Sequence, residues 1–149
     1  KLENPVLQDI NLEILRGEII SIMGQSGCGK TTLLNLLGGL DRPTSGNIFL
    51  NGKRLTEMND SELTRFRLRN IGIVFQFFSL IPTLTAVENV RLPLLVSGHG
   101  HIEARERPLQ LLDQVGLLDK ANRMPYKMSR EEQQRVAVAR ALVNEPSIF

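Results

Sequence analysis

Short apolar runs separated by glycine and polar residues predict strands in the first half of the chain. Leu7–Ile14 alternates loosely between apolar and polar positions, which predicts a strand. The runs Ile19–Met23 and Ile71–Phe75 are nearly continuous, as is typical of strands buried on both faces of a parallel sheet. Asn47–Leu50 predicts a further short strand, because the Asn51-Gly52 dipeptide after it favours a hairpin turn.

Apolar residues at helical spacing, together with capping residues, predict helices at five places. The expected helices are Lys30–Leu40, a basic helix capped by Asp60 or Ser61 that reaches about Arg69, a helix opened by the capping box Thr85–Glu88, Glu103–Val115 with Pro108 in its interior, and Ser129–Val143. Met124–Met128 is expected to be a loop, and Pro146–Phe149 begins another apolar run.

The composition is that of a folded globular protein, with 149 residues of which 42% are apolar and 23% charged. The formal net charge of +2 does not indicate a nucleic-acid or membrane-surface partner. Cys28 is the only cysteine, which excludes an intramolecular disulfide and a cysteine zinc cluster. The most apolar stretch, Leu80–Val96, is interrupted by charges and prolines, and Lys1–Ile10 lacks the apolar region of a signal peptide. A role at a membrane would therefore need another chain or segment.

A complete phosphate-binding motif lies between the run Ile19–Met23 and the helix expected at Lys30. Gly24–Thr31 reads Gly-Gln-Ser-Gly-Cys-Gly-Lys-Thr and matches G-x-x-x-x-G-K-[ST] at every fixed position. Glycines let successive backbone N–H groups turn inward around an anion, and the helix N-terminus adds further donors and its positive dipole end. The motif predicts a site for the phosphates of a nucleotide, which kinases, GTPases, helicases and transport ATPases share.

Each residue of the motif has an expected part in that site. Lys30 is expected to reach the β- and γ-phosphates, and the Thr31 hydroxyl to ligate Mg²⁺. The ATP-binding residues predicted are Gly24, Gln25, Ser26, Gly27, Cys28, Gly29, Lys30, Thr31 and Thr32. The alternative is a glycine-rich turn that binds nothing, and Cys28 is interpreted as a small filler rather than a reactive thiol.

Two segments that follow the motif in the chain indicate which class of P-loop protein this sequence resembles. Ile73-Val-Phe-Gln76 follows the motif, and further along Met128-Ser129-Arg-Glu-Glu-Gln-Gln-Arg135 leads into a helix. Their order and spacing resemble the ATP-binding subunits of ABC transporters, with Gln76 at the place of the Q-loop glutamine and Ser129 at that of the signature serine. The stretch Phe75–Val90 resembles the subgroup of lipoprotein-release, MacB-type and FtsE-type ATPases.

The resemblance implies an α/β fold, with a P-loop NTPase core, a small antiparallel β-part and an inserted α-helical subdomain. The implied divisions are 1–76, 77–128 and 129–149. It also implies a homodimer or heterodimer of nucleotide-binding domains around two ATP molecules, and an integral membrane permease as partner at the cytoplasmic side of the cell membrane. Lys30 and Gln76 would both act in hydrolysis, and Gln76 would also contact Mg²⁺. No nucleic-acid partner is expected.

The signature segment departs from the family pattern. The family reads Leu-Ser-Gly-Gly-Gln, whereas here Arg130 and Glu131 stand at the glycine positions and Glu132 follows. Side chains add bulk beside a γ-phosphate, and carboxylates add like-charge repulsion. The alternative interpretation of Ser129–Glu132 is a capping box with acids at a helix N-terminus.

Other family features would lie outside the sequence. The Walker B strand would begin at Ser147–Phe149, so the chain is expected to be part of a longer ATPase subunit and not competent for hydrolysis alone. The aromatic residue that stacks on adenine would precede Lys1. His99 and His101 are interpreted as solvated loop residues rather than metal ligands.

Two alternative functions remain beside an ATP-driven transport subunit. A non-transport ABC protein acting on DNA or ribosomes would carry a long insertion between Gln76 and Ser129, and the spacing here leaves little room for one. A nucleotide-binding module without turnover would suit the altered signature.

Overall fold

The computed structural model describes residues 5–98, 100 and 102–149, which form two compact units. The first unit ends at Met58, and the second runs from Asn59 to Phe149. The first contains helix α1 (Lys30–Leu37), strands β1 (Phe49–Leu50) and β2 (Lys53–Arg54), and the 3-10 turn η1 (Leu55–Glu57). The second contains α2 (Asp60–Asn70), α3 (Ala86–Ser97), α4 (Glu103–Gln114), the 3-10 turns η2 (Leu118–Lys120) and η3 (Pro125–Lys127), and α5 (Arg130–Leu142).

The β-part of the first unit is one antiparallel hairpin. Phe49 pairs with Arg54 and Leu50 with Lys53. Asn51 and Gly52 join the strands with φ angles of 50° and 74°, and two-residue hairpin turns favour such positive values. The predicted turn is confirmed.

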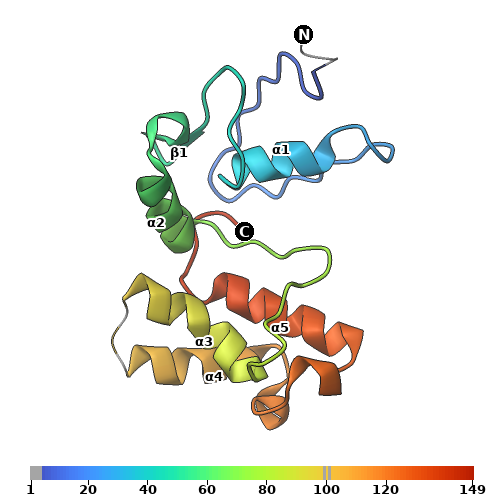
Figure 1. Ribbon diagram of the computed structural model, residues 1–149, viewed down its shortest axis with the longest axis vertical. Coiled ribbons are helices and arrows are strands. Elements are labelled where there is room, and N and C mark those ends of the chain that lie inside the picture. The colour runs from blue at the N-terminus through green and yellow to red at the C-terminus, as the bar shows by residue number, and fades with distance from the viewer. Residues whose placement is uncertain (1–4, 99, 101) are drawn as a thin grey trace. The chain divides into compact units, whose positions relative to one another are not determined.

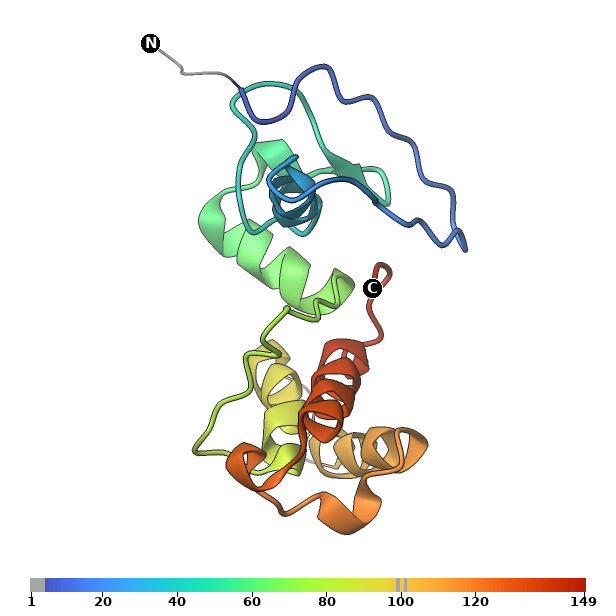
Figure 2. The same ribbon diagram turned by 90° about the vertical axis from the view of Figure 1, so that its right-hand side faces the viewer.

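The second unit is a helical bundle in which α3 packs against both α4 and α5 (Figure 1, Figure 2). Its centre is apolar, and burying each large side chain stabilises the fold by about 1.5–3 kcal/mol. The largest fully buried apolar side chains are Val90, Leu94, Leu112, Leu117, Val136 and Val143. The described residues of the first unit contribute nothing to this core cluster.

Three helices begin with capping boxes, in which a side chain and a glutamate three residues later satisfy each other's backbone N–H groups. Thr85 caps α3 and Ser129 caps α5, as predicted. For α2 the cap is Asn59 rather than the predicted Asp60 or Ser61, because Asn59 is the residue that Glu62 reaches. The predicted loop at Met124–Met128 contains the turn η3.

Prolines inside two helices are accommodated at the cost of a backbone hydrogen bond. Pro108 is the sixth residue of α4, and its buried ring contributes to the packing of the bundle. The predicted helix at Glu103 is confirmed and ends at Gln114. Pro93 lies within α3 in the same way.

The strands predicted for the longer apolar runs are absent from the structure. Leu7–Ile14 and Ile19–Met23 have no strand conformation, and Ile19 and Met23 are 98% and 87% exposed. In Ile71–Phe75 only Ile71 pairs, in a single parallel bridge with Ile148. These predictions were wrong because a strand exists only with a hydrogen-bonded neighbour, and the described residues supply no neighbour beyond that bridge.

Within the described residues, no helix is long and apolar enough to span a membrane.

Candidate phosphate-binding site

The loop Gly24–Gly29 depends on two glycines in the left-handed region. Gly27 has φ 81° and Gly29 has φ 94°, angles at which a residue with a Cβ is strained. Gly29 is also buried, and a Cβ there would lie 2.9 Å from Leu7 Cδ2 and 3.3 Å from the Val6 carbonyl oxygen. At Gly24, a Cβ would lie 2.7 Å from Cys28 Sγ. The positive φ angles therefore favour glycine at positions 27 and 29, and at Gly29 the nearby Leu7 and Val6 atoms leave no room for a side chain.

Helix α1 leaves its N-terminus open toward this loop. It begins at Lys30 with Gly29 as N-cap, and the first helical bond runs from Leu33 N to Gly29 O at 2.9 Å. Among the described residues no side chain caps this end, and its first turn carries no acid. Unpaired N–H groups and a positive dipole end are the features of an anion-binding helix N-terminus.

The Lys30 side chain folds back over the loop. Its Nζ donates to the carbonyl oxygens of Gly24 and Gln25, both at 2.7 Å, and lies 3.6 Å from Cys28 Sγ. These carbonyls are neutral acceptors, and an anionic oxygen in the loop would form a charge-assisted bond of about twice their strength. The ammonium group is thus held where a phosphate in the loop would meet it.

The other motif side chains are positioned for solvent or ligand. Gln25, Ser26, Cys28 and Thr31 are exposed, and Thr32 is partly buried. Among the described residues no group of three or more histidine, cysteine, aspartate or glutamate side chains could hold a metal ion. The donor set nevertheless fits Mg²⁺, which binds proteins through few side chains and takes its remaining ligands from phosphates and water. Thr31 would supply the hydroxyl.

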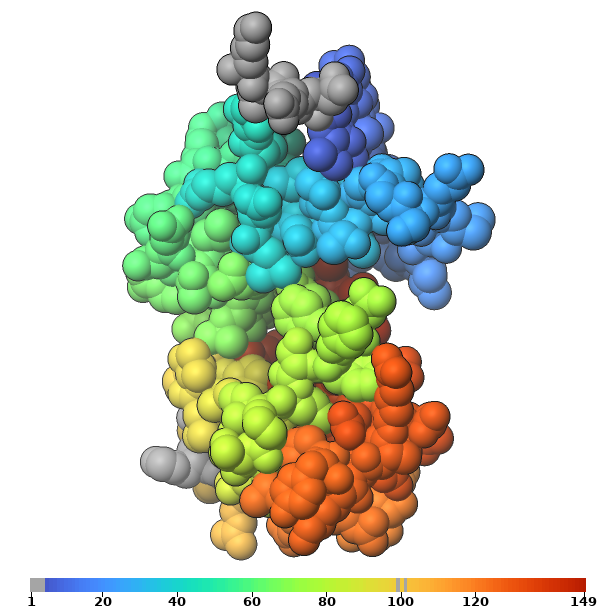
Figure 3. All heavy atoms as spheres, turned by 45° about the vertical axis from the view of Figure 1, so that its right-hand side comes forward, coloured from blue at the N-terminus to red at the C-terminus, as the bar shows by residue number. Residues whose placement is uncertain are grey.

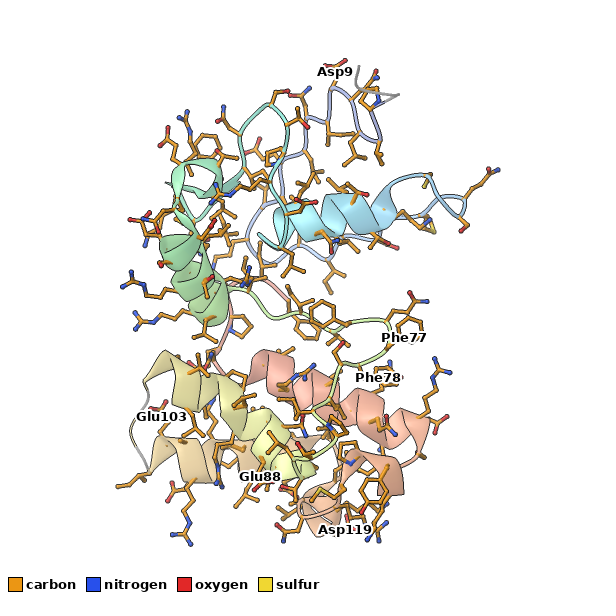
Figure 4. All side chains as sticks on the ribbon, viewed as in Figure 1. Asp9, Phe77, Phe78, Glu88, Glu103 and Asp119 are labelled. Atoms are coloured by element: carbon orange, nitrogen blue, oxygen red, sulfur yellow. The ribbon has the colours of Figure 1, made fainter. Side chains whose placement is uncertain are left out.

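Gln76 lies in the second unit, in an exposed turn rather than at the end of a strand. The turn is closed by a 2.9 Å bond from Phe78 N to Phe75 O. Because the P-loop belongs to the first unit, the expected contacts of Gln76 with Mg²⁺ and the γ-phosphate stay predictions. Figure 4 labels Phe77 and Phe78 on this loop, with Phe78 the nearer to α5.

Ser129–Glu132 forms the predicted capping box at the start of α5. Glu132 N donates to Ser129 Oγ at 3.2 Å, and Ser129 N donates to Glu132 Oε2 at 2.8 Å. The Lys120 ammonium lies 2.6 Å from Glu132 Oε1. Arg130 and Glu131, at the family's glycine positions, are exposed. The helix-cap interpretation is confirmed, and a part in binding phosphate stays a prediction.

Electrostatics at this helix start favour ionised carboxylates. The Lys120 hydrogen bond and the Ser129 backbone N–H hold the pKa of Glu132 below its usual range. Backbone hydrogen bonding, followed by the Ser129 side chain, lowers the pKa of Glu131. Both glutamates are therefore negative at neutral pH, which suits the N-terminus of a helix but opposes a phosphate beside it.

Sequence patterns did not indicate two side chains that hold the segment after Gln76. Arg140 donates to the carbonyl oxygens of Phe78 and Ser79, both at 2.6 Å. Asn89, which is 0% exposed, accepts from Ile81 N at 2.8 Å and donates to the carbonyls of Ile81, Leu84 and Thr85 at 3.0–3.1 Å. Polar residues on buried helix faces were the only available signal. His99 and His101 lie outside the described residues.

The complete G-x-x-x-x-G-K-[ST] motif at an open helix N-terminus, with its lysine folded over the loop, is the pattern of a P-loop protein. The sequence model of the ABC transporter family matches residues 7–149. The chain belongs to the ABC transporter family.

Curated relatives agree with this assignment. The chain is 53% identical over 144 residues to the lipoprotein-releasing system ATP-binding protein LolD of Aquifex aeolicus, covering 97% of this chain and 64% of that one. It is 49% identical over 149 residues to LolD 1 of Chlorobium chlorochromatii, covering 99% and 61%. It is 50% identical to the uncharacterized ABC transporter ATP-binding protein YknY of Bacillus subtilis, covering 97% and 63%. The chain thus spans less than two thirds of the length of these relatives.

A solved structure shows the same fold. The ATP-binding cassette MJ0796, determined as a dimer in a post-hydrolysis state with ADP and Pi, superposes with a TM-score of 0.88 at 47% identity. The match covers 95% of this chain and 62% of the cassette. The α/β fold expected for the P-loop core is confirmed by this likeness, together with the small antiparallel β-part.

Proposed function

We propose that the chain is the ATP-binding part of an ABC transporter subunit, which couples ATP hydrolysis to transport by a membrane partner. The observation that carries the proposal is the P-loop. Lys30 Nζ lies over the loop, between carbonyls 2.7 Å away, at the open N-terminus of α1. A nucleotide triphosphate is the anion that this motif holds. The names of the relatives, all ATP-binding proteins, support the choice of ATP.

Each site residue then has a defined part. The N–H groups of Gly27–Thr32 surround the phosphates, and Lys30 neutralises charge between the β- and γ-positions. Thr31 would hold Mg²⁺ through its hydroxyl, and the bound ion would supply further charge neutralisation. Gln76 would contact Mg²⁺ and would orient water toward the γ-phosphate.

A dimer of nucleotide-binding domains is the proposed assembly, with Ser129 facing the nucleotide of the opposite subunit. Its support is the dimeric state of the cassette MJ0796. An integral membrane permease is the proposed partner, and the cytoplasmic face of the membrane is the proposed location. Their support is that several relatives are named as ATP-binding proteins of a lipoprotein-releasing system.

One observation favours a second candidate, nucleotide binding without turnover. Arg130 and Glu131 occupy the first turn of α5, and the two glutamates beside Ser129 are ionised. A γ-phosphate approaching this helix N-terminus from another subunit would meet their negative charge.

Phosphate release distinguishes the two candidates. The full chain encoded by the gene should hydrolyse Mg-ATP, and Lys30→Ala should reduce the rate by at least about 100-fold, because it removes a charge that acts on the transferred phosphoryl group. Gln76→Ala should reduce kcat by about 10- to 100-fold through lost orientation of water.

The matched control is Gln110→Ala, which changes an exposed glutamine on α4 and should leave turnover unchanged. Saturable ATP binding without Lys30-dependent phosphate release would support the second candidate. Turnover that survives Lys30→Ala would contradict the P-loop assignment.

A further inference from the structure

The turn that carries Gln76 has an unusual backbone. Phe78 and Ser79 are successive non-glycine residues in the left-handed region, with φ angles of 59° and 48°. Ser79 N donates to Phe77 O at 2.6 Å, and Phe78 N closes the turn on Phe75 O. A side chain disfavours this region, so the conformation persists only where neighbouring groups impose it.

The Arg140 guanidinium contacts this part of the backbone directly. One of its terminal nitrogens donates to Ser79 O and the other to Phe78 O, each at 2.6 Å. A planar fork can hold two successive carbonyls in one fixed relation, which a single ammonium group cannot do with the same geometry. Figure 3 shows the lime-coloured segment lying against the orange-red surface at the start of α5.

Arg140 projects from a rigid support. On the same helix Val136, Ala137 and Ala139 are 0% exposed, so the turn of α5 that precedes the arginine is packed into the bundle. The arginine is itself partly buried, and burial lowers the pKa of its guanidinium, which stays charged at neutral pH. A partly buried charge is tolerated where its hydrogen bonds offset the free energy lost when it is removed from water.

A second arginine of α5 contacts the same residue. The Arg130 guanidinium lies 6.0 Å from the centre of the Phe78 ring, within the range of a cation–π contact. Beyond Ser79, the buried amide of Asn89 fixes the chain from Ile81 to Thr85. The segment after Gln76 thus has no regular secondary structure, but side chains of α3 and α5 hold it at successive points.

We propose that Arg140 is a positioning residue for Gln76, whose turn it fixes through the carbonyl groups of Phe78 and Ser79. The inference rests on the proposed function, in which Gln76 contacts the γ-phosphate site. Arg140 contacts no nucleotide in this account. Its effect on hydrolysis passes through the turn, because rotation of Phe78 or Ser79 out of the left-handed region would redirect the residues before them.

Arg140→Met tests the proposal in the full chain encoded by the gene. Methionine keeps an unbranched stem and good helix propensity while removing both donors. The expected result is a fall in kcat of about 10- to 100-fold with the ATP dissociation constant changed less than about threefold. In a Gln76→Ala background the same substitution should change kcat less than about twofold, because residues that act as a unit are not additive.

Two comparisons separate positioning from general destabilisation. Arg135→Met is the matched control, since Arg135 is exposed on the same helix and makes one 3.5 Å contact, with Val115 O. It should leave kcat unchanged. In Arg140→Met, hydrogen exchange at the amides of Phe78 and Ser79 should accelerate, while the amides of α3 stay protected.

Losses in kcat that multiply in the double variant, or an unchanged exchange rate at Phe78 and Ser79, would overturn the proposal. If Arg140→Met does not fold, Arg140→Lys, which keeps the charge on a shorter stem, enters the same double-variant comparison. If wild-type turnover does not depend on Lys30, the proposed function fails, and the exchange measurement still decides whether Arg140 holds the turn.

Discussion

At the scale of single residues, the conformation of the loop Gly24–Gly29 depends on the absence of a Cβ at two of its glycines. Gly27 and Gly29 have similar positive φ angles, but their surroundings differ. A Cβ on Gly27 would meet nothing within 4 Å, whereas one on Gly29 would lie 2.9 Å from Leu7 Cδ2. The motif fixes glycine at position 29 and leaves position 27 free, so the structure adds a conformational reason for glycine at Gly27 and a steric one at Gly29.

Alanine at these two positions should therefore destabilise the first unit unequally. Gly27→Ala should cost about 1–2 kcal/mol, the penalty of placing a Cβ in the left-handed region. Gly29→Ala should cost at least about 1 kcal/mol more, because it adds the contacts with Leu7 and Val6. Hydrogen exchange of the α1 amides measures the local opening free energy, and equal losses in the two variants would contradict the steric account.

At the scale of elements, capping boxes define the starts of α2, α3 and α5 in the second unit. The Ser129–Glu132 box is reinforced by Lys120, and the two side chains of that ion pair are 26% and 20% exposed. The pKa of Glu132 is lowered in the folded chain, first by Lys120 and then by the Ser129 backbone. The stabilisation is therefore fully present above the ordinary glutamate pKa and is lost as the pH falls through the lower folded value.

Glu132→Gln should reduce the acid sensitivity of α5. Glutamine keeps an oxygen for the capping box but has no charge to lose. Below about pH 4.3, the ordinary pKa of a glutamate, the wild-type chain should lose more unfolding free energy than the variant. Urea unfolding at neutral and acid pH measures this difference. Glu106→Gln on α4 is the exposed control, and it should lose as much unfolding free energy on acidification as the wild type does. Identical acid losses in wild type and Glu132→Gln would count against the capping-box account.

Helices could be predicted from the sequence more fully than strands or long-range contacts. Helices satisfy their backbone groups internally, so Thr85 and Ser129 with their glutamates located two starts correctly, and Pro108 did not break its helix. Strands depend on partners, so the isoleucine run at Ile19 was insufficient to define one. The P-loop could be predicted because one contiguous segment of the sequence contains it. The Arg140 contacts could not be predicted, because they join residues about 60 positions apart in the chain.

At the scale of the whole molecule, the family match spans both units and so places their chemistry in a single cassette. Residues 7–149 belong to one family domain. Lys30 in the first unit and Gln76 and Ser129 in the second are then parts of one proposed ATPase. The first unit contains the proposed phosphate site, and the second contains the segments proposed to respond to the nucleotide.

Equilibrium binding of Mg-ATP to the chain tests the central claim most directly. A fluorescent ATP analogue, displaced by unlabelled ATP, should bind saturably, and Lys30→Ala should raise the dissociation constant by at least about 100-fold because a charge-assisted contact with phosphate is lost. Lys53→Ala, which changes an exposed lysine on β2 of the same unit, should bind as the wild type does. An unchanged dissociation constant in Lys30→Ala, or an equal loss in Lys53→Ala, would contradict the assignment of Gly24–Thr31 as the nucleotide site.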